Sequence, residues 1–194
     1  MEKSVLARGK IRQFLLVILG IVIGLSAGTL ILVGLDPSWL LNQPEGSSGS
    51  QPVIPEVNQA APDFALTTLT GESVRLSELK GRVVAVNFWA TWCGPCRLEM
   101  PLLQTYADRY PQDLTVLAVN DAEPIEKVQP YVDDLGLSFP ILLDEKELVT
   151  RLYRVRGFPT TIFIDRDGKI RYQHLGLLME DQLRGYLTEL GIEE

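Results

Sequence analysis

The sequence predicts an α/β domain in which a central mixed β-sheet carries helices on both faces, preceded by one transmembrane helix. Residues 14–35 are uncharged and mostly apolar, as a membrane span requires. After residue 60, β-branched apolar runs alternate with helical patterns, which indicates a sheet covered by helices. A turn signal at residues 165–168 joins the last two strands as a hairpin, so the sheet is expected to be mixed.

The N-terminal run is long enough to cross a bilayer. Its 22 residues would form a helix of roughly 33 Å at about 1.5 Å per residue. Basic side chains stay on the cytoplasmic side, so the C-terminal domain is expected in a periplasm, a lumen or the cell exterior. Those ahead of the run are Lys3, Arg8, Lys10 and Arg12. A cleavable signal peptide, with an apolar core of about 7–15 residues, is the alternative.

Small residues in this run suggest that two copies can pair. Gly20, Gly24 and Gly28 repeat at every fourth position, a spacing that lets membrane helices approach closely. Glycine is also common in unpaired spans. The expected partners of residues 14–35 are therefore the lipid bilayer and, as a further hypothesis, a second copy in a weak dimer.

Composition divides the chain into four parts. They are a cytoplasmic basic segment (1–13), a transmembrane anchor (14–35), a flexible linker (36–58) rich in Ser, Gly, Pro and Gln, and a folded domain (59–194). Residues 1–13 carry four basic and one acidic side chain, so the net charge of −7 leaves −10 for the rest. Such an acidic exported part argues against nucleic acid as a partner.

The elements of the domain follow from residue type and periodicity. Seven segments have the composition of strands: 64–69, 73–76, 83–89, 114–120, 139–144, 160–165 and 169–175. Four have the apolar spacing of helices: 96–110, 125–135, 146–153 and 180–190. Thr70-Gly71 predicts a hairpin between the first two strands, which form an N-terminal extension. Pro130 is expected to kink or break its helix.

The stretch NFWATWCGPCRLEMP holds the only two cysteines of the chain, Cys93 and Cys96. A Cys-x-x-Cys pair that follows a buried strand and opens a helix is typical of a redox-active dithiol. Free N–H groups at a helix N-terminus stabilise a thiolate at Cys93, and Cys96 lies one turn later on the same face. Gly94 and Pro95 form the active-site turn, and Pro95 suits a first helical turn.

Three other readings of the pair are open. A structural disulfide would close a loop too short to restrain the unfolded chain strongly. A zinc site needs four ligands, and His174 is the only histidine. Inert core thiols would not require a Gly-Pro turn between them. The redox interpretation is favoured, with the Cys93–Cys96 disulfide as the redox group and with no metal or other cofactor expected.

The motifs NFWATWCGPC, CRLEMP and RGFPTTIFIDRDGKI occur in the order in which they resemble the thioredoxin superfamily. Together with the lead-in APDFALTTLTGESVRLSELKG, they are most similar to the TlpA/ResA-like membrane-anchored thiol–disulfide oxidoreductases. The resemblance covers residue 60 to the C-terminus and implies a thioredoxin fold. It also implies an enzyme that acts on protein disulfides or dithiols and receives electrons from a membrane donor, with apocytochrome c maturation as one setting.

The resemblance assigns roles to individual residues. Cys93 matches an exposed nucleophile and Cys96 a buried resolving thiol. Trp92 matches the tryptophan beside the active-site edge. Pro159 matches a proline whose preceding peptide is cis and which faces the dithiol, so Phe158 would offer backbone groups to a bound peptide. An ordinary strand-entry proline is the alternative for Pro159.

The resemblance is incomplete at the proton acceptor and between the cysteines. Asn87 stands where thioredoxins have a buried aspartate, and an amide takes no proton from Cys96. In this branch an acidic residue after the next strand approaches the site, which points to Glu123, with a solvated loop carboxylate as the alternative. Glu99 is expected to be structural. The Gly-Pro pair resembles cytoplasmic thioredoxin and favours a reductant.

Two other functions have less support. A peroxiredoxin-like peroxidase suits the lead-in, but Thr91 lies two residues before Cys93 rather than three, and no proline precedes it. A copper-delivery protein would place three residues between its cysteines and a histidine on a loop, whereas His174 is expected late in a strand.

The anchor hypothesis predicts the topology of the chain. A reporter fused after Glu194 is expected to be active only if it works outside the cytoplasm, because the basic flank stays inside. The protein is also expected to remain with the membrane pellet under carbonate extraction. Release of a mature form that lacks residues 1–35 would contradict the anchor and favour the signal peptide.

Overall fold

The structure is a computed structural model that describes residues 56–193. The strands in this range are β1 (Ala65–Thr68), β2 (Ser73–Arg75), β3 (Val83–Trp89), β4 (Leu114–Asp121), β5 (Ile141–Asp144), β6 (Thr160–Ile164) and β7 (Ile170–Leu175). The helices are the 3-10 helix η1 (Leu76–Leu79) and the α-helices α3 (Gly94–Arg109), α4 (Ile125–Leu135), α5 (Leu148–Leu152) and α6 (Glu180–Glu189).

The strands form one mixed sheet in the order β2-β1-β5-β4-β3-β6-β7. The central strands β3, β4 and β5 are parallel, while β6 pairs antiparallel with both β3 and β7. The predicted hairpin of β1 and β2 is confirmed, and β1 also pairs antiparallel with β5. The N-terminal extension therefore lengthens the central sheet.

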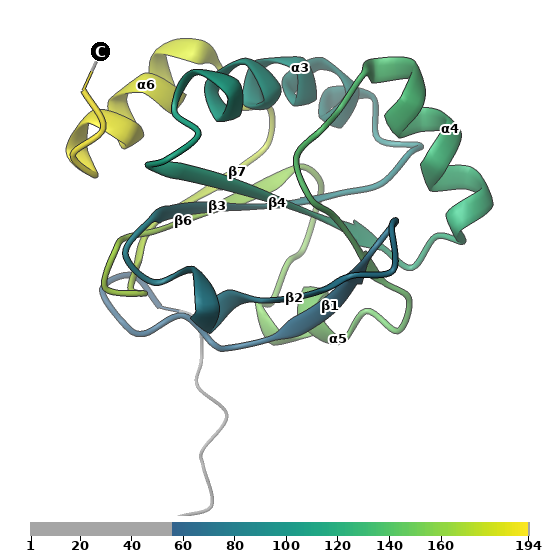
Figure 1. The fold of residues 1–194 in the computed structure, drawn as a ribbon, viewed down its shortest axis with the longest axis horizontal. Coiled ribbons are helices and arrows are strands. Elements are labelled where there is room, and N and C mark those ends of the chain that lie inside the picture. The colour runs from purple at the N-terminus through teal and green to yellow at the C-terminus, as the bar shows by residue number, and fades with distance from the viewer. Residues whose placement is uncertain (1–55, 194) are drawn as a thin grey trace, which may run out of the picture. The chain divides into compact units, whose positions relative to one another are not determined.

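Helices cover both faces of the sheet, as predicted (Figure 1). α3, α4 and α6 lie on one face, and α5 with η1 lies on the other. Alternate residues of β3 face the two cores: Val84, Val86 and Phe88 point toward α5, whereas Ala85 and Trp89 point toward α3. Every residue of β3 is buried, which explains why all of them except Asn87 are apolar.

Several boundaries differ from the sequence-based expectation. β5 begins at Ile141 rather than at residue 139, and Pro140 ahead of it has no N–H to donate to a neighbouring strand. α5 begins at Leu148, because the buried carboxylate of Asp144 accepts the backbone N–H groups of residues 148–150 and fixes the first turn there. α4 does not break at Pro130 but continues to Leu135.

The N-terminal predictions fall mostly outside the described residues. Across residues 56–193 no helix is long and apolar enough to cross a membrane. The basic segment, the anchor with its glycines and most of the linker precede this range. At its start, the backbone N–H of Asn58 donates to the Ile170 carbonyl at 2.6 Å, so the ordered contacts begin just inside the predicted linker.

Candidate active site

Cys93 lies between the end of β3 and the start of α3. It is the N-cap residue of α3, and Gly94 and Pro95 are the first helical residues. Its Sγ accepts a hydrogen bond from the backbone N–H of Cys96 at 3.2 Å. The two cysteines form a disulfide with their Cα atoms 5.3 Å apart, so the structure holds the oxidised dithiol. The predicted location, in the first turn after a buried strand, is confirmed.

The dithiol is largely covered in this oxidised state. Cys93 is 4% exposed and Cys96 is fully buried, so Cys93 is not the exposed residue that the resemblance implied. The residue that faces solvent is its neighbour Trp92, which is 71% exposed. The Trp92 ring lies edge-on to the ring of Phe158, with centroids 5.7 Å apart. An exposed indole beside the sulfurs is available to contact another molecule.

The loop before β6 comes to the same place. The Phe158–Pro159 peptide bond is cis, as the resemblance implied. Pro159 is buried, and Phe158 packs against the core cluster that contains both cysteines. The Pro159 carbonyl accepts a hydrogen bond from Gly176 at 2.8 Å, which ties the end of β7 to this loop. Binding of a peptide by the Phe158 backbone stays a prediction.

Glu123 holds the segment that leads into the dithiol. Its carboxylate accepts hydrogen bonds from the N–H and the hydroxyl of Thr91, both at 2.6 Å, and from the Asn120 amide at 3.0 Å. Burial acts to raise the pKa of Glu123, but these hydrogen bonds and the charge of Lys127 outweigh it and lower that pKa. Proton acceptance by Glu123 stays a prediction, whereas its contacts fix Thr91 two residues before Cys93.

A second carboxyl, Glu99, lies three residues after Cys96 on α3 and is only 1% exposed. Its Oε1 accepts a hydrogen bond from the Asn87 amide at 2.6 Å, and its Oε2 accepts one from the backbone N–H of Leu178 at 2.9 Å. Burial raises the pKa of Glu99 to about 7 despite these two hydrogen bonds, which act to lower it. This carboxyl can therefore gain and lose a proton near neutral pH.

The expectation that Glu99 is structural agrees with its hydrogen bonds to Asn87 and Leu178, but its raised pKa goes beyond that expectation. One signal was available: residues three apart on a helix share a face, so Glu99 follows Cys96 on the same side of α3. The other determinants come from distant segments. Asn87 reaches Glu99 from β3, and Leu178 reaches it from a loop that lies 79 residues later in the chain.

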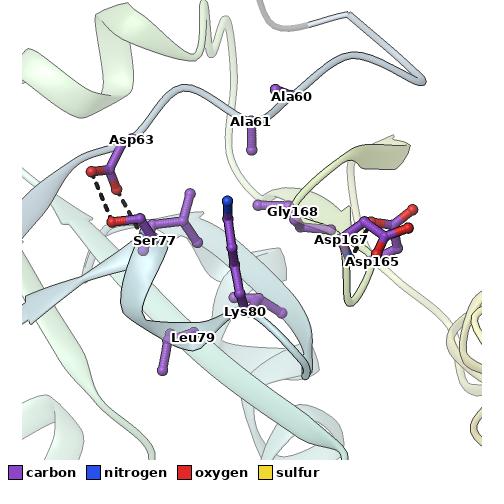
Figure 2. A pocket seen from close by; sticks show the side chains of 12 residues that line it. Ala60, Ala61, Asp63, Ser77, Leu79, Lys80, Asp165, Asp167 and Gly168 are labelled. Atoms are coloured by element: carbon purple, nitrogen blue, oxygen red, sulfur yellow. Dashed lines mark hydrogen bonds between the residues drawn. The ribbon is translucent and has the colours of Figure 1, made fainter.

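A separate cavity of about 160 Å³ lies at the other end of the sheet (Figure 2). Its lining includes the apolar side chains of Val84 near the start of β3 and Ile164 at the end of β6. Lys80 rises through it, and Asp63 on its rim is hydrogen-bonded to Ser77. Val84 is about 17 Å along β3 from Trp89 at roughly 3.3 Å per residue, so this cavity is remote from the dithiol.

Within residues 56–193, no group of three or more His, Cys, Asp or Glu side chains is arranged to hold a metal ion. His174 lies in β7, as expected, and its ring nitrogens contact the Tyr186 hydroxyl and the Leu177 carbonyl. The hydrogen-bond contacts of this side chain are therefore to α6 and to the loop that follows β7.

Comparison with known proteins places the chain among thioredoxin-like oxidoreductases. The AhpC/TSA family matches residues 57–173. The chain is 44% identical over 128 residues to the thioredoxin-like protein YneN of Bacillus subtilis strain 168, covering 64% of this chain and 75% of YneN. It is 38% identical over 135 residues to the thiol-disulfide oxidoreductase ResA of Geobacillus kaustophilus strain HTA426, covering 69% of this chain and 78% of ResA.

A solved structure gives the same result for the fold. A crystal structure from Chlorobium tepidum, described as a thiol:disulfide interchange protein DsbE, superposes with a TM-score of 0.64 and 37% sequence identity. The match covers 71% of this chain and 97% of that chain. The thioredoxin-like fold that the sequence predicted is thus confirmed for the described domain.

The raised pKa of Glu99 predicts how the stability of the oxidised protein depends on pH. Its folded-state pKa of about 7 lies above the ordinary value of 4.5, so the folded protein holds this proton more tightly than the unfolded chain does. That stabilisation is fully present below pH 4.5 and is lost as the pH rises to about 7. In Glu99→Gln the group stays neutral, so the stability of this variant relative to wild type should rise by roughly 3 kcal/mol over that interval.

Glu123→Gln is the matched control, and chemical denaturation at each pH is the measurement for both variants. Because the pKa of Glu123 is lowered, its ionised form stabilises the fold above the unfolded-state pKa, and this stabilisation is lost as the pH falls. The stability of Glu123→Gln relative to wild type should therefore decrease as the pH rises. A pH-independent difference for Glu99→Gln would contradict the raised pKa.

Proposed function

This chain belongs to the AhpC/TSA family and is a thiol–disulfide oxidoreductase, and from that premise we propose that it is a membrane-tethered, extracytoplasmic reductant of protein disulfides. The observation that carries the proposal is the Cys93–Cys96 disulfide at the N-terminus of α3, close in the chain to a carboxyl that titrates near pH 7. Residues 14–35 supply the tether, and apocytochrome c is the client class that we propose.

The first step is attack by Cys93. In the reduced protein the backbone N–H of Cys96 and the other free N–H groups at the start of α3 favour a thiolate at Cys93. This thiolate attacks one sulfur of the client disulfide, the client S–S bond breaks, and one client thiolate leaves. The product is a mixed disulfide between Cys93 and the client.

The second step is release of the client by Cys96. Its thiol must lose a proton before it can attack Cys93 Sγ, because the thiolate is the nucleophile. We propose that Glu99 accepts this proton, since it is buried on the same helix three residues later and titrates near neutral pH. The attack forms the Cys93–Cys96 disulfide and frees the second client thiolate. The client gains two electrons, and a membrane donor then returns two electrons to the chain.

Protein clients fit the surface around the dithiol. Trp92 next to Cys93, Leu98 near the start of α3, and Leu175 beside the loop tied to Pro159 are all largely exposed apolar side chains. Large apolar side chains that remain exposed in a folded protein are candidates for contact with another molecule. An unfolded client that presents apolar residues beside its disulfide would cover them.

Single-cysteine variants test the order of the two steps. Cys93→Ser is expected to abolish reduction of a protein disulfide such as insulin, because the attacking thiolate is gone. Cys96→Ser is expected to perform one attack and then to remain as a mixed disulfide, which can be isolated from cells to identify the client. Accumulation of a mixed disulfide in Cys93→Ser instead would reverse the assignment, and capture of no c-type apocytochrome would remove that client class.

Paired carboxyl variants test the proton acceptor. If Glu99 accepts the proton of Cys96, Glu99→Gln should slow turnover at neutral pH and move the thiolate titration of the reduced protein down by about one unit, because a nearby negative charge is removed. Glu123→Gln should leave that titration in place. Thiolate absorbance against pH, measured beside reductase rates, decides between them: a shift in Glu123→Gln alone would favour Glu123.

A further inference from the structure

A row of polar side chains crosses the sheet beneath α3 and α6. Asn87 of β3 is paired in register with Thr161 of β6, and Thr161 is paired with His174 of β7. Directly opposed residues of antiparallel strands have their side chains on the same face. The Asn87 amide donates to the Thr161 hydroxyl at 2.9 Å as well as to Glu99. The row therefore leads from the buried carboxyl to the only histidine of the chain.

The ring of His174 contacts the loop that follows β7. Its Nε2 lies 3.2 Å from the Leu177 carbonyl oxygen, and its Nδ1 lies 3.3 Å from the hydroxyl of Tyr186 on α6. A carbonyl oxygen can only accept a hydrogen bond, so Nε2 carries the hydrogen in this contact. In the neutral ring Nδ1 then accepts a hydrogen bond from the hydroxyl of Tyr186, which fixes the ring orientation.

One peptide group joins His174 to Glu99. The carbonyl of Leu177 and the N–H of Leu178 belong to the same amide: the oxygen faces the His174 ring, and the N–H donates to Glu99 Oε2 at 2.9 Å. Leu178 is buried, so water does not compete for this hydrogen bond. A hydrogen bond to the oxygen of an amide polarises it and strengthens donation by its N–H.

We propose that His174 is a positioning residue for the dithiol reaction, which aligns and polarises the Leu177–Leu178 peptide against Glu99. The proposal rests on the role of Glu99 proposed above. In this role, His174 holds the Leu178 N–H, the donor to Glu99 Oε2, in place. His174 acts only through this peptide and belongs to a part of the sheet that no catalytic step uses.

The loop is fastened at both ends without His174. Gly176 donates to the Pro159 carbonyl at 2.8 Å, and the N–H of Met179 donates to the Gln182 side chain at 3.0 Å. Loss of the imidazole therefore removes the contact at the centre of the loop and leaves its ends attached. The expected effect is on the carboxyl, not on the path of the chain.

Two tyrosines are the other titratable side chains near His174 within residues 56–193, and neither is hydrogen-bonded to Glu99. Tyr186 reaches it from α6, and Tyr172 on the same face of β7 stacks on Tyr186 with centroids 4.8 Å apart. The Tyr172 hydroxyl donates to Glu189 at the end of α6. The carboxyl of Glu99 on α3 accepts hydrogen bonds from Asn87 and from the N–H of Leu178. Tyr172→Phe is therefore a matched control on the same strand and face.

The test measures the titration of Glu99 directly in the full-length chain. Infrared spectroscopy of protein with isotope-labelled glutamate reports the protonated carboxyl against pH, and Glu99→Gln identifies its band. His174→Phe keeps a ring without the donor and should raise the pKa of Glu99 by about one unit, a tenfold change in its ionisation, because the Leu178 N–H stabilises the carboxylate less. The pH profile of disulfide reduction should move by the same amount.

In His174→Gln the pKa of Glu99 should return most of the way to its wild-type value, since the new amide can donate to the Leu177 carbonyl, and Tyr172→Phe should leave the titration unchanged. An unshifted Glu99 titration in His174→Phe, or equal shifts in His174→Phe and His174→Gln, would overturn the proposal. If His174→Phe does not fold, Tyr186→Phe takes its place with a smaller upward shift expected, and no shift there would count against His174.

The infrared measurement also tests the role of His174 separately from proton acceptance by Glu99. If Glu99→Gln leaves the thiolate titration and the turnover unchanged, Glu99 is not the proton acceptor. The response of the Glu99 band to His174→Phe would still show whether the histidine controls this carboxyl. If Glu99→Gln alters turnover while His174→Phe leaves the titration of the Glu99 band unchanged, the results support Glu99 as the proton acceptor and contradict the proposed role of His174.

Discussion

The buried carboxyl of Glu99 is the constraint on which the arrangement around the dithiol depends. Removing a carboxyl from water is costly unless polar partners replace the lost hydration. Two donors from separate parts of the fold do so here, the amide of Asn87 and the backbone N–H of Leu178. One side chain thereby fixes α3 against β3 and against the loop between β7 and α6. The same burial raises its pKa to about 7.

Two carboxyls near the dithiol are pushed in opposite directions by their surroundings. Glu99, with two donors and almost no exposure, has a raised pKa. Glu123 accepts three hydrogen bonds, which lower its pKa in spite of burial. Two acids whose pKa values are driven apart suit different tasks. The raised pKa of the first brings its titration near neutral pH, and the lowered pKa of the second favours the charged form that holds Thr91.

The sequence predicted the parts of the fold that depend on local pattern. The mostly apolar strand β3, the Gly-Pro turn at the start of α3 and the late hairpin all follow from residue type and spacing. The cis peptide before Pro159 followed from family resemblance, because no local pattern requires it. The pairing of β1 with β5 was not predicted, since strand order depends on contacts between residues far apart in the chain.

The same limit explains the errors at the site. Asp144 sets the start of α5 through hydrogen bonds that sequence periodicity does not record. The sequence predicted a structural role for Glu99, which its hydrogen bonds support, but it did not predict the raised pKa. Its chemistry comes from Asn87, twelve residues earlier, and from Leu178, much later. Burial and long-range donors decide the pKa of a carboxyl, and neither is visible in a short motif.

The position of Glu99 has a consequence for the redox state of the dithiol. In the disulfide neither sulfur is charged, so nothing on Cys96 opposes ionisation of Glu99. After reduction, a thiolate at Cys96 and a carboxylate at Glu99 would be two negative charges on one turn of α3, which is unfavourable in a buried site. If Glu99 has the role proposed above, the two groups would share one proton in the reduced state. Uptake of electrons from a donor is accompanied by uptake of protons, and raising the pH should favour the disulfide.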